Sequence, residues 1–367
     1  MGTTTATAAV LHRLGDALQL EEIWFDSLGS REVRVRVRAS GICRSDLTVS
    51  STNHGFPLPM LLGHEVAGVV EEVGSEVTGL HPGDHVVGCP VNQCGRCNAC
   101  RSGQPYRCSN HGVTERNPGE SARVTVGGTK ATQFIGIGGF STQVVMHENL
   151  AVRVPEEIPF DIACLLGCGV STGLGAALNS AQVRHGDTVL VVGCGGVGLN
   201  VVQGARLAGA RRIIAMDKNV EALELALQLG ATDIINADSD DPVRQVKDLT
   251  SNAGVTHAFE VIGLPQTLEL AMDALGTGGG AYLIGVQKPD EVLGIPFQHF
   301  FQQKSVHGVA MGSSIPHIHI PEYADLYLQG RLQLDALVAQ RISLSEVNDG
   351  FDRLIQGGAA RSVIIFD

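Results

Sequence analysis

Two patterns of apolar and polar positions divide the chain. In its first part, residues 31–39 (REVRVRVRA) alternate apolar and charged side chains, which is typical of a half-exposed strand. Residues 66–73 and 83–88 are further short apolar segments bounded by Gly, Pro and Asp. Residues 110–133 are polar and contain Gly and Pro, so we expect a long surface excursion there. This part is therefore predicted to be rich in β-strands.

From about residue 158 the pattern becomes one of strands alternating with helices. Strands are predicted at residues 188–192, 212–216, 234–235, 258–262 and 281–286, and helices at 197–208, 220–229 and 266–275. Such alternation predicts βαβ units and a parallel sheet. After about residue 304 the pattern is mixed again and closes in a strand at 362–366. The prediction is an α/β protein in which a β-rich domain (1–165 and 305–367) is interrupted by a doubly wound domain (166–304).

Charge and composition limit the classes of molecule that the protein is expected to bind and its expected location. The net charge of −12 argues against nucleic acid or an anionic membrane surface, because both are bound mainly by basic patches. Residues 1–13 lack the pattern of a secretory signal, and the longest apolar candidate, 189–199, is interrupted by glycines and falls short of a membrane span. We therefore predict a cytoplasmic protein, in which the nine cysteines are metal ligands or buried thiols rather than disulfides.

Four cysteines form one compact motif, CGRCNACRSGQPYRC, with Cys94, Cys97, Cys100 and Cys108. Repeated Cys-x₂-Cys steps let one short loop supply several thiolates to a tetrahedral zinc ion. With sulfur at all four positions, the site is predicted to be closed and structural. A cluster of unpaired thiols or an iron–sulfur site are the alternatives, although the latter commonly carries a further Cys-Pro step.

A second metal site is predicted from three separate segments, GICRSD, GHE and LLGCG. Together they supply Cys43, His64 and Cys168, the ligand set known for catalytic zinc in alcohol dehydrogenases. Three protein ligands leave a fourth position for water or substrate. Asp46 is expected to fix the tautomer of His64, and Glu65 to lie just behind the metal. Taken singly, each of these residues would more often be an ordinary core or surface side chain.

A nucleotide site is predicted at Gly193-Cys194-Gly195-Gly196-Val197-Gly198. This GxGxxG run follows the strand 188–192 and opens a helix, so the pyrophosphate of a dinucleotide is expected at the helix N-terminus. Asp217 ends the next strand, where its carboxylate can bind a ribose 2′-hydroxyl and repel a 2′-phosphate. These features predict NAD, although Lys218 and the neighbouring arginines favour tolerance of NADP. A purely structural glycine turn is the alternative.

With these residues in place, the whole chain resembles the zinc-containing medium-chain alcohol dehydrogenases. GHE continuing to Gly68, Gly74 and Val77, the four-cysteine lobe, LLGCGVSTG, GCGGVG and FEVIG carry the resemblance. LLGCGVSTGLGAA, PFQ and DLYLQGRL are most similar to the branch of glutathione- or mycothiol-linked formaldehyde dehydrogenases. The resemblance implies a GroES-like catalytic domain, a Rossmann domain, two zinc ions per chain and a homodimer.

The same resemblance assigns roles to further residues. It implies that Ser45 helps to remove the proton of an alcohol whose hydride passes to NAD. Arg44 and Arg361 are expected near the cofactor pyrophosphate, and Val197 and Val286 near the nicotinamide, with Val286 also facing the substrate alongside Pro90, Phe134 and Ile135. Cys89, Cys164 and Cys194 are expected to be buried thiols, and Phe297, Phe300 and Phe301 core or subunit contacts.

Two departures from the family pattern bear on the substrate. Thr48 stands where many relatives have a histidine that relays the proton to solvent. Residues 51–55 (STNHG) and Gly112 lack the acidic residues and the arginine with which glutathione-dependent relatives hold their co-substrate. We therefore expect an apolar or aromatic primary alcohol, bulky ones included, rather than a glutathione adduct. A thiol-dependent, mycothiol-type formaldehyde dehydrogenase is one alternative, and a non-enzymatic protein that binds NAD and zinc is the other.

Overall fold

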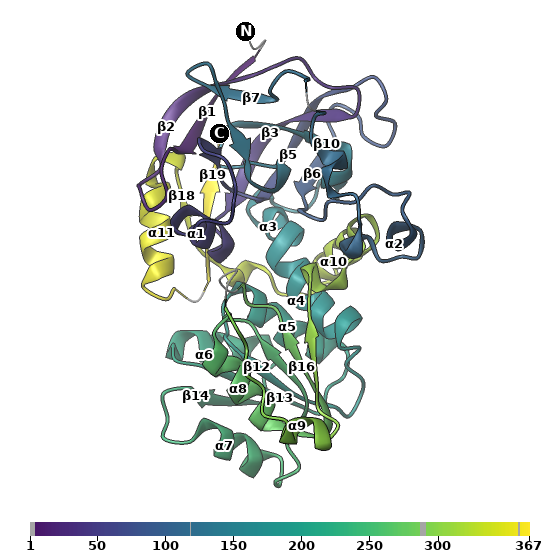
Figure 1. Ribbon diagram of the computed structural model, residues 1–367, viewed down its shortest axis with the longest axis vertical. Coiled ribbons are helices and arrows are strands. Elements are labelled where there is room, and N and C mark those ends of the chain that lie inside the picture. Colours follow the sequence, from purple (N-terminus) through teal and green to yellow (C-terminus); the bar gives the residue numbers. More distant parts are fainter. Residues whose placement is uncertain (1–3, 118, 287–290, 359) are drawn as a thin grey trace. The chain divides into compact units, whose positions relative to one another are not determined.

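The computed structural model of the 367-residue chain describes residues 4–117, 119–286, 291–358 and 360–367. The chain divides into two compact units: Met1–Cys168 with Ile315–Asp367 form unit 1, and Gly169–Ser314 form unit 2 (Figure 1). These limits lie three and ten residues beyond the predicted ones. The larger difference arises because β17 (Ser305–Gly308) completes the sheet of unit 2 and the 3-10 turn Met311–Ser313 packs against α4 (Ser171–Gly175).

The larger sheet of unit 1 has β3 at its centre, in the order β11-β6-β5-β3-β19-β18, with β10 also paired to β3. Its strands are β3 (Glu32–Gly41), β5 (Glu65–Val73), β6 (His85–Gly88), β10 (Gln143–His147), β11 (Ala151–Arg153), β18 (Val338–Ile342) and β19 (Arg361–Ile365). The predicted strands at 31–39, 66–73, 83–88 and 362–366 are confirmed. The alternating valines of β3 enter the core of the unit.

A second sheet of unit 1 has the order β8-β7-β2-β1-β4-β9. Its strands are β1 (Thr4–Leu11), β2 (Gln19–Phe25), β4 (Met60–Leu61), β7 (Val124–Val126), β8 (Thr129–Lys130) and β9 (Thr132–Gln133). The last three lie in the segment predicted as a surface excursion, so this segment is partly sheet. The helices of unit 1 are α1 (Arg44–Ser51), α2 (Asn98–Arg101), α3 (Phe160–Leu165), α10 (Pro316–Leu328) and α11 (Val347–Ile355).

Helix α3 begins a longer helical run, Phe160–Ser180, which contains two π-helical turns, Leu166–Val170 and Ala176–Ser180. Within the part of the chain that the structure describes, this run alone is long and apolar enough to cross a membrane. Its apolar window is 89% buried inside the protein, which identifies it as a core helix. Residues 189–199 are therefore not the longest apolar segment, because the earlier run tolerates small Gly and Ser residues without breaking.

Unit 2 is a parallel six-stranded sheet with the order β14-β13-β12-β15-β16-β17. Its other strands are β12 (Thr188–Val192), β13 (Arg212–Asp217), β14 (Asp233–Asn236), β15 (Val255–Glu260) and β16 (Leu275–Leu283). Its remaining helices are α5 (Gly196–Leu207), α6 (Val220–Leu229), α7 (Pro242–Leu249), α8 (Pro265–Ala274) and α9 (Gln298–Phe301). Since β13 and β15 flank β12 on opposite sides, the chain reverses its winding at β12, where ligands bind in such sheets. The predicted doubly wound domain is confirmed.

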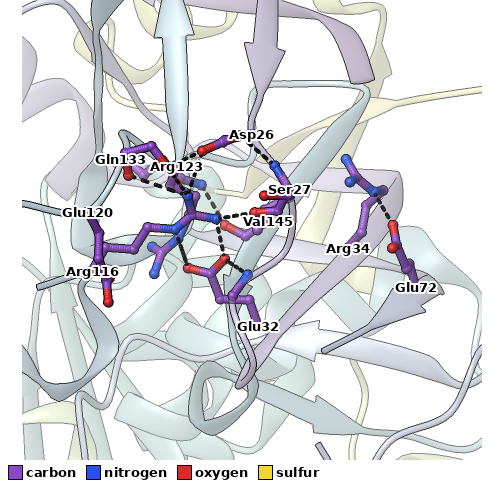
Figure 2. A network of polar contacts seen from close by, with 12 residues as sticks. Asp26, Ser27, Glu32, Arg34, Glu72, Arg116, Glu120, Arg123, Gln133 and Val145 are labelled. Atoms are coloured by element: carbon purple, nitrogen blue, oxygen red, sulfur yellow. Dashed lines mark hydrogen bonds and ion pairs between the residues drawn. The ribbon is translucent and has the colours of Figure 1, made fainter. Parts of the chain in front are cut away.

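The buried carboxylate of Glu32, at the start of β3, binds two arginines of the segment 110–133. Glu32 accepts hydrogen bonds from Arg116 at 2.6 Å and from Arg123 at 2.8 Å (Figure 2). Burial opposes ionisation, but the two guanidinium groups lower the pKa of Glu32 to about 2. Arg34, two residues on, is buried and pairs with Glu72 at 3.1 Å. The prediction that β3 is half exposed is therefore wrong at these two positions, because partners distant in sequence cover its charged face.

Candidate active site and nucleotide site

The larger sheet of unit 1 gathers the ends of three strands around Gly41. This residue, at the end of β3, pairs with Glu65 at the start of β5 and with Val363 of β19. A Cβ atom at Gly41 would lie 2.4 Å from a carboxylate oxygen of Glu65, so glycine leaves the room that this buried side chain occupies. The register therefore brings the segments of Cys43, Glu65 and Arg361 together although they are far apart in sequence.

Cys43, His64 and Cys168 converge in unit 1 and are all buried. One ligand atom from each of them, together with one from Glu65, fits within a mutual distance of 4.8 Å. His64 Nε2 lies 3.2 Å from Cys168 Sγ. Cys168 reaches the site from the π-helical turn Leu166–Val170, an irregularity frequent at functional positions. The two sulfurs and the imidazole nitrogen suit a zinc ion.

Asp46 holds the segments of Cys43 and His64 in place through hydrogen bonds. It is fully buried at the third position of α1, and its carboxylate accepts hydrogen bonds from the backbone N–H of Cys43 at 3.2 Å and of Gly63 at 2.9 Å. Its Oδ1 lies 3.0 Å from Nδ1 of His64. Burial lowers the pKa of His64, but the charge and hydrogen bond of Asp46, together with the effects of Cys43, outweigh it and the net shift is upward. An imidazole that donates through Nδ1 presents Nε2 as a metal ligand.

Glu65 and Arg361 form a buried ion pair beside the cluster. Arg361 donates to Glu65 at 3.0 Å and to Cys43 Sγ at 3.4 Å. Burial raises the pKa of Glu65 to about 7, against the opposing effect of Arg361. The second oxygen of Glu65 is buried and has no hydrogen-bond partner among the described residues. This spare acceptor next to two sulfurs suits a nearby cation, and the expected role of Arg361 toward a pyrophosphate stays a prediction.

Ser45 places a hydroxyl group beside the cluster. Its Oγ lies 3.3 Å from Cys43 Sγ and 3.3 Å from His64 Nε2. Thr48, one turn further along α1, donates its hydroxyl to the carbonyl of Arg44 at 3.0 Å. The side chain that replaces the relay histidine is thus occupied with its own helix. The role of Ser45 in proton exchange stays a prediction.

An aromatic wall stands beside His64. The ring of Phe134 meets His64 edge-on at 5.5 Å between centroids, and Phe56 meets Phe134 edge-on at 5.4 Å. Ile135 follows with φ +50°, a strained backbone conformation for a β-branched residue. Phe134 and Ile135 were expected at the substrate, whereas Phe56 was missed, because nothing in the sequence pairs it with Phe134. Pro90 is half-buried two residues after the end of β6, and its expected place at the substrate stays a prediction.

The four lobe cysteines also converge. Their sulfur atoms all lie within 4.8 Å of one another. Backbone N–H groups donate to the sulfurs, from Cys97 to Cys94 at 3.3 Å and from Cys94 to Cys108 at 3.3 Å. The N–H of Cys100 contributes most to lowering the pKa of Cys97, to about 5. Such a set fits a closed zinc site with thiolate ligands.

The glycine-rich turn of unit 2 has the backbone that close approach to a phosphate requires. Gly193 adopts φ +98°, and a Cβ atom at Gly198 would lie 1.8 Å from the Gly193 carbonyl oxygen. A Cβ atom at Gly195 would meet nothing within 4 Å, so the turn opens into free space there. Among the described residues no side chain caps α5. Its first N–H groups can therefore hold a pyrophosphate.

Asp217 ties this turn to the end of β13. One carboxylate oxygen accepts the N–H of Cys194 at 2.6 Å and the other that of Asn219 at 2.9 Å. Lys218 is exposed. Val286 is exposed as well, and its carbonyl oxygen lies so close to Gly263 that a Cβ atom on Gly263 would be 2.6 Å from it. The thiols of Cys89, Cys164 and Cys194 are buried as expected. The roles assigned to Arg44, Val197 and Val286 stay predictions.

Known proteins match both units. Residues 29–156 match the family Alcohol dehydrogenase GroES-like domain, and residues 196–329 match the family Zinc-binding dehydrogenase. The chain is 38% identical to S-(hydroxymethyl)glutathione dehydrogenase from Synechocystis sp., over 97% of this chain and 98% of that protein. It is 32% identical to benzyl alcohol dehydrogenase from Acinetobacter calcoaceticus, with a TM-score of 0.93 and coverage of 99% and 100%.

A third solved structure bears on the cofactor. A putative zinc-binding dehydrogenase from Sinorhizobium meliloti, bound to NADP, is 25% identical with a TM-score of 0.82, over 99% of this chain and 100% of that one. Zinc and a nicotinamide cofactor therefore belong to the family, in agreement with the thiolate clusters and the glycine turn described above. The chain belongs to the zinc-dependent alcohol dehydrogenases of the medium-chain dehydrogenase/reductase family, near their glutathione-linked branch.

Proposed function

We propose that this enzyme oxidises apolar or aromatic primary alcohols with NAD and reduces the corresponding aldehydes in reverse. The observation that carries the proposal is the buried cluster of Cys43, His64 and Cys168 with Ser45 Oγ 3.3 Å from His64 Nε2. The edge-on pair Phe56–Phe134 beside His64 supports an aromatic substrate, since such rings pack well against another ring. Benzyl alcohol dehydrogenase as a structural relative points the same way.

Each residue of the site has a separate role in the proposed reaction. Cys43, His64 and Cys168 would hold zinc, which supplies a Lewis acid that polarises the oxygen of the alcohol. The nicotinamide supplies the hydride acceptor. Ser45 Oγ accepts the proton of the alcohol and passes its own hydroxyl proton to water, because Thr48 is bonded to its own helix. Asp46 keeps His64 oriented, and Phe134 excludes water from one side of the site.

The test is NADH formation by the zinc-loaded protein across primary aliphatic, aryl and terpenoid alcohols. We expect the highest kcat/KM with aryl alcohols, and no activity with Cys43→Ala. Absence of NADH formation across the whole panel, from protein with two zinc ions bound, would favour a non-enzymatic protein that binds NAD and zinc.

A thiol-dependent formaldehyde dehydrogenase is the second candidate, because the 38% identical relative is an S-(hydroxymethyl)glutathione dehydrogenase. Residues 51–55 and Gly112 carry none of the charged side chains expected for binding glutathione. We therefore favour a neutral sugar thiol such as mycothiol if a thiol takes part. Formaldehyde oxidation that depends on added mycothiol, and exceeds the rates with aryl alcohols, would select this candidate.

We also propose two zinc ions per chain, a cytoplasmic location and a homodimer. Support for the homodimer comes from unit 2, where β17 is an edge strand and the nearby side chains of Phe297 and Phe301 are 71% and 79% exposed. Phe300 is also exposed, so the three are not core residues, and subunit contact remains the prediction for them. Light scattering should give twice the chain mass. Phe301→Asp should shift it toward the monomer, whereas a monomeric wild-type protein would contradict the proposal.

A further inference from the structure

Strands β13 and β14 bring two short segments together at the carboxyl edge of the sheet in unit 2. Asp217 pairs with Asn236, and the N–H of Ala237 donates to the Asp217 carbonyl oxygen at 2.9 Å. The chain therefore continues past β14 alongside the residue expected to bind the adenosine ribose. Lys218 and Asp238 are the first charged side chains beyond these strand ends.

These two side chains form an ion pair. Lys218 Nζ lies 2.8 Å from Asp238 Oδ1, with both side chains largely exposed, at 74% and 60%. A turn fixes the backbone that carries this carboxylate, because the N–H of Asp238 donates to the side chain of Asn236 at 2.8 Å. The pair also raises the pKa of Lys218, which stays charged. The ammonium group beside Asp217 thus already has an anionic partner.

The charges of Asp217, Lys218 and Asp238 bear on which nucleotide can bind beside them. Asp217 and Asp238 contribute two negative charges, and Lys218 one positive charge. A ribose 2′-hydroxyl needs only an acceptor, which Asp217 provides. A 2′-phosphate brings further negative charge, and its natural partner would be Lys218, as basic residues accommodate this group in NADP-binding sheets. To bind it, Lys218 would have to leave Asp238 and bring the phosphate close to that carboxylate.

We propose that Asp238 is a specificity-determining residue that withholds Lys218 from a 2′-phosphate and so favours NAD over NADP. The inference rests on the proposed use of NAD and adds a residue that the glycine-rich motif does not include. Removing the carboxylate frees Lys218 for the phosphate and removes one repulsive charge. Since exposed ion pairs are weak and screened by salt, the expected gain is roughly fivefold in affinity for the phosphorylated ribose at low ionic strength.

Binding of two fragments tests this without turnover. Adenosine 5′-monophosphate and adenosine 2′,5′-bisphosphate differ only in the 2′-phosphate, so their Kd ratio on the zinc-loaded full-length protein isolates that group. By isothermal titration calorimetry we expect Asp238→Asn to tighten the bisphosphate about fivefold and to leave the monophosphate within about twofold. NAD and NADP should follow the same order.

Two matched variants complete the experiment. Asp240→Asn removes the same charge two residues away, from an exposed side chain that forms no ion pair with the described residues, and should leave the ratio unchanged. Asp238→Asn combined with Lys218→Ala should lose most of the gain, because only the relief of repulsion by Asp238 is left. An unchanged ratio in Asp238→Asn, an equal effect of Asp240→Asn, or a gain that survives Lys218→Ala undiminished would each overturn the role of Asp238. A wild-type protein that binds both fragments equally would instead contradict the NAD proposal, and the inference with it.

Discussion

The carboxylate of Asp46 lies 3.0 Å from Nδ1 of His64, and the opposite ring nitrogen of His64 lies 3.2 Å from Cys168 Sγ. The carboxylate thereby determines which nitrogen of the ring faces the sulfurs. Because the same group also accepts two backbone N–H bonds, it fixes the segments of Cys43 and His64 relative to each other.

Asp46→Asn should weaken zinc binding at the cluster of Cys43, His64 and Cys168. The amide keeps the volume but loses the charge that orients the imidazole, and such substitutions behind a metal ligand cost about 10- to 100-fold in metal affinity. Competition with a chelator, followed by metal analysis, measures the effect. Glu76→Gln, at an exposed carboxylate, is the control. Unchanged zinc retention in Asp46→Asn would contradict the assigned role.

Cys43→Ala and Cys97→Ala should separate the two predicted zinc sites. Each variant loses ligands from one cluster only, so each should retain one zinc ion per chain instead of two. Cys43→Ala should abolish NADH formation with little change in thermal stability, whereas Cys97→Ala should lower stability because the lobe loses its metal cross-link. Unchanged kcat in zinc-replete Cys43→Ala would refute the catalytic assignment.

Glu32→Gln should destabilise unit 1 by about 3 kcal/mol near neutral pH, because it leaves two partly buried guanidinium groups without their counter-charge. The pKa of Glu32 is lowered from 4.5 to about 2 by Arg116 and Arg123, despite burial. The ion pair therefore stabilises the fold above pH 4.5, and this stability is lost as the pH falls toward 2. The difference between wild type and variant in urea unfolding should shrink over that range.

The control for this experiment is Glu120→Gln. Glu120 is exposed near the same network, where it bonds to Asn117, and its removal should change the unfolding midpoint little at any pH (Figure 2). A constant difference between wild type and Glu32→Gln from neutral pH to pH 3 would contradict the low pKa of Glu32.

Asp217→Ala should weaken NAD binding and reduce the preference for NAD over NADP. The variant loses the acceptor for the ribose hydroxyl, and it also releases the N–H of Cys194, so the glycine turn loosens and both cofactors lose affinity. Asp217→Asn keeps an acceptor for that N–H and should isolate the effect of charge. Fluorescence titration gives both Kd values, and an unaltered ratio in both variants would argue against the ribose role.

The Cys, His and Gly motifs were readable from the sequence because each needs a specific residue type at a short spacing. Strands β12 to β16 of unit 2 were readable as well, since buried parallel strands are continuous apolar runs, as in residues 188–192. Strand β17 was missed, because its polar residues Ser305 and His307 interrupt such a run. Helix Phe160–Ser180 was missed, because its glycines and serines weaken the helical pattern while fitting it closely against Gly88.

Ion pairs between residues distant in sequence could not be predicted from the sequence. Nothing near Glu32 indicates that Arg116 and Arg123 cover it, nor does the sequence link Arg361 to Glu65, 296 residues away. Both relationships follow from strand register, which the pattern of single segments leaves open. The Lys218–Asp238 pair has the same origin in the register of β13 and β14.

The position of β19 determines when the cluster of Cys43, His64 and Cys168 can be completed during synthesis of the chain. This strand lies between β3 and β18 and delivers Arg361, so the sheet around Gly41 cannot close until residues 361–365 have left the ribosome. The strands of unit 2, all within residues 188–308, emerge earlier and can assemble during translation. A nascent chain can therefore form the sheet of unit 2 first, whereas the cluster of Cys43, His64 and Cys168 gains Arg361 only afterwards.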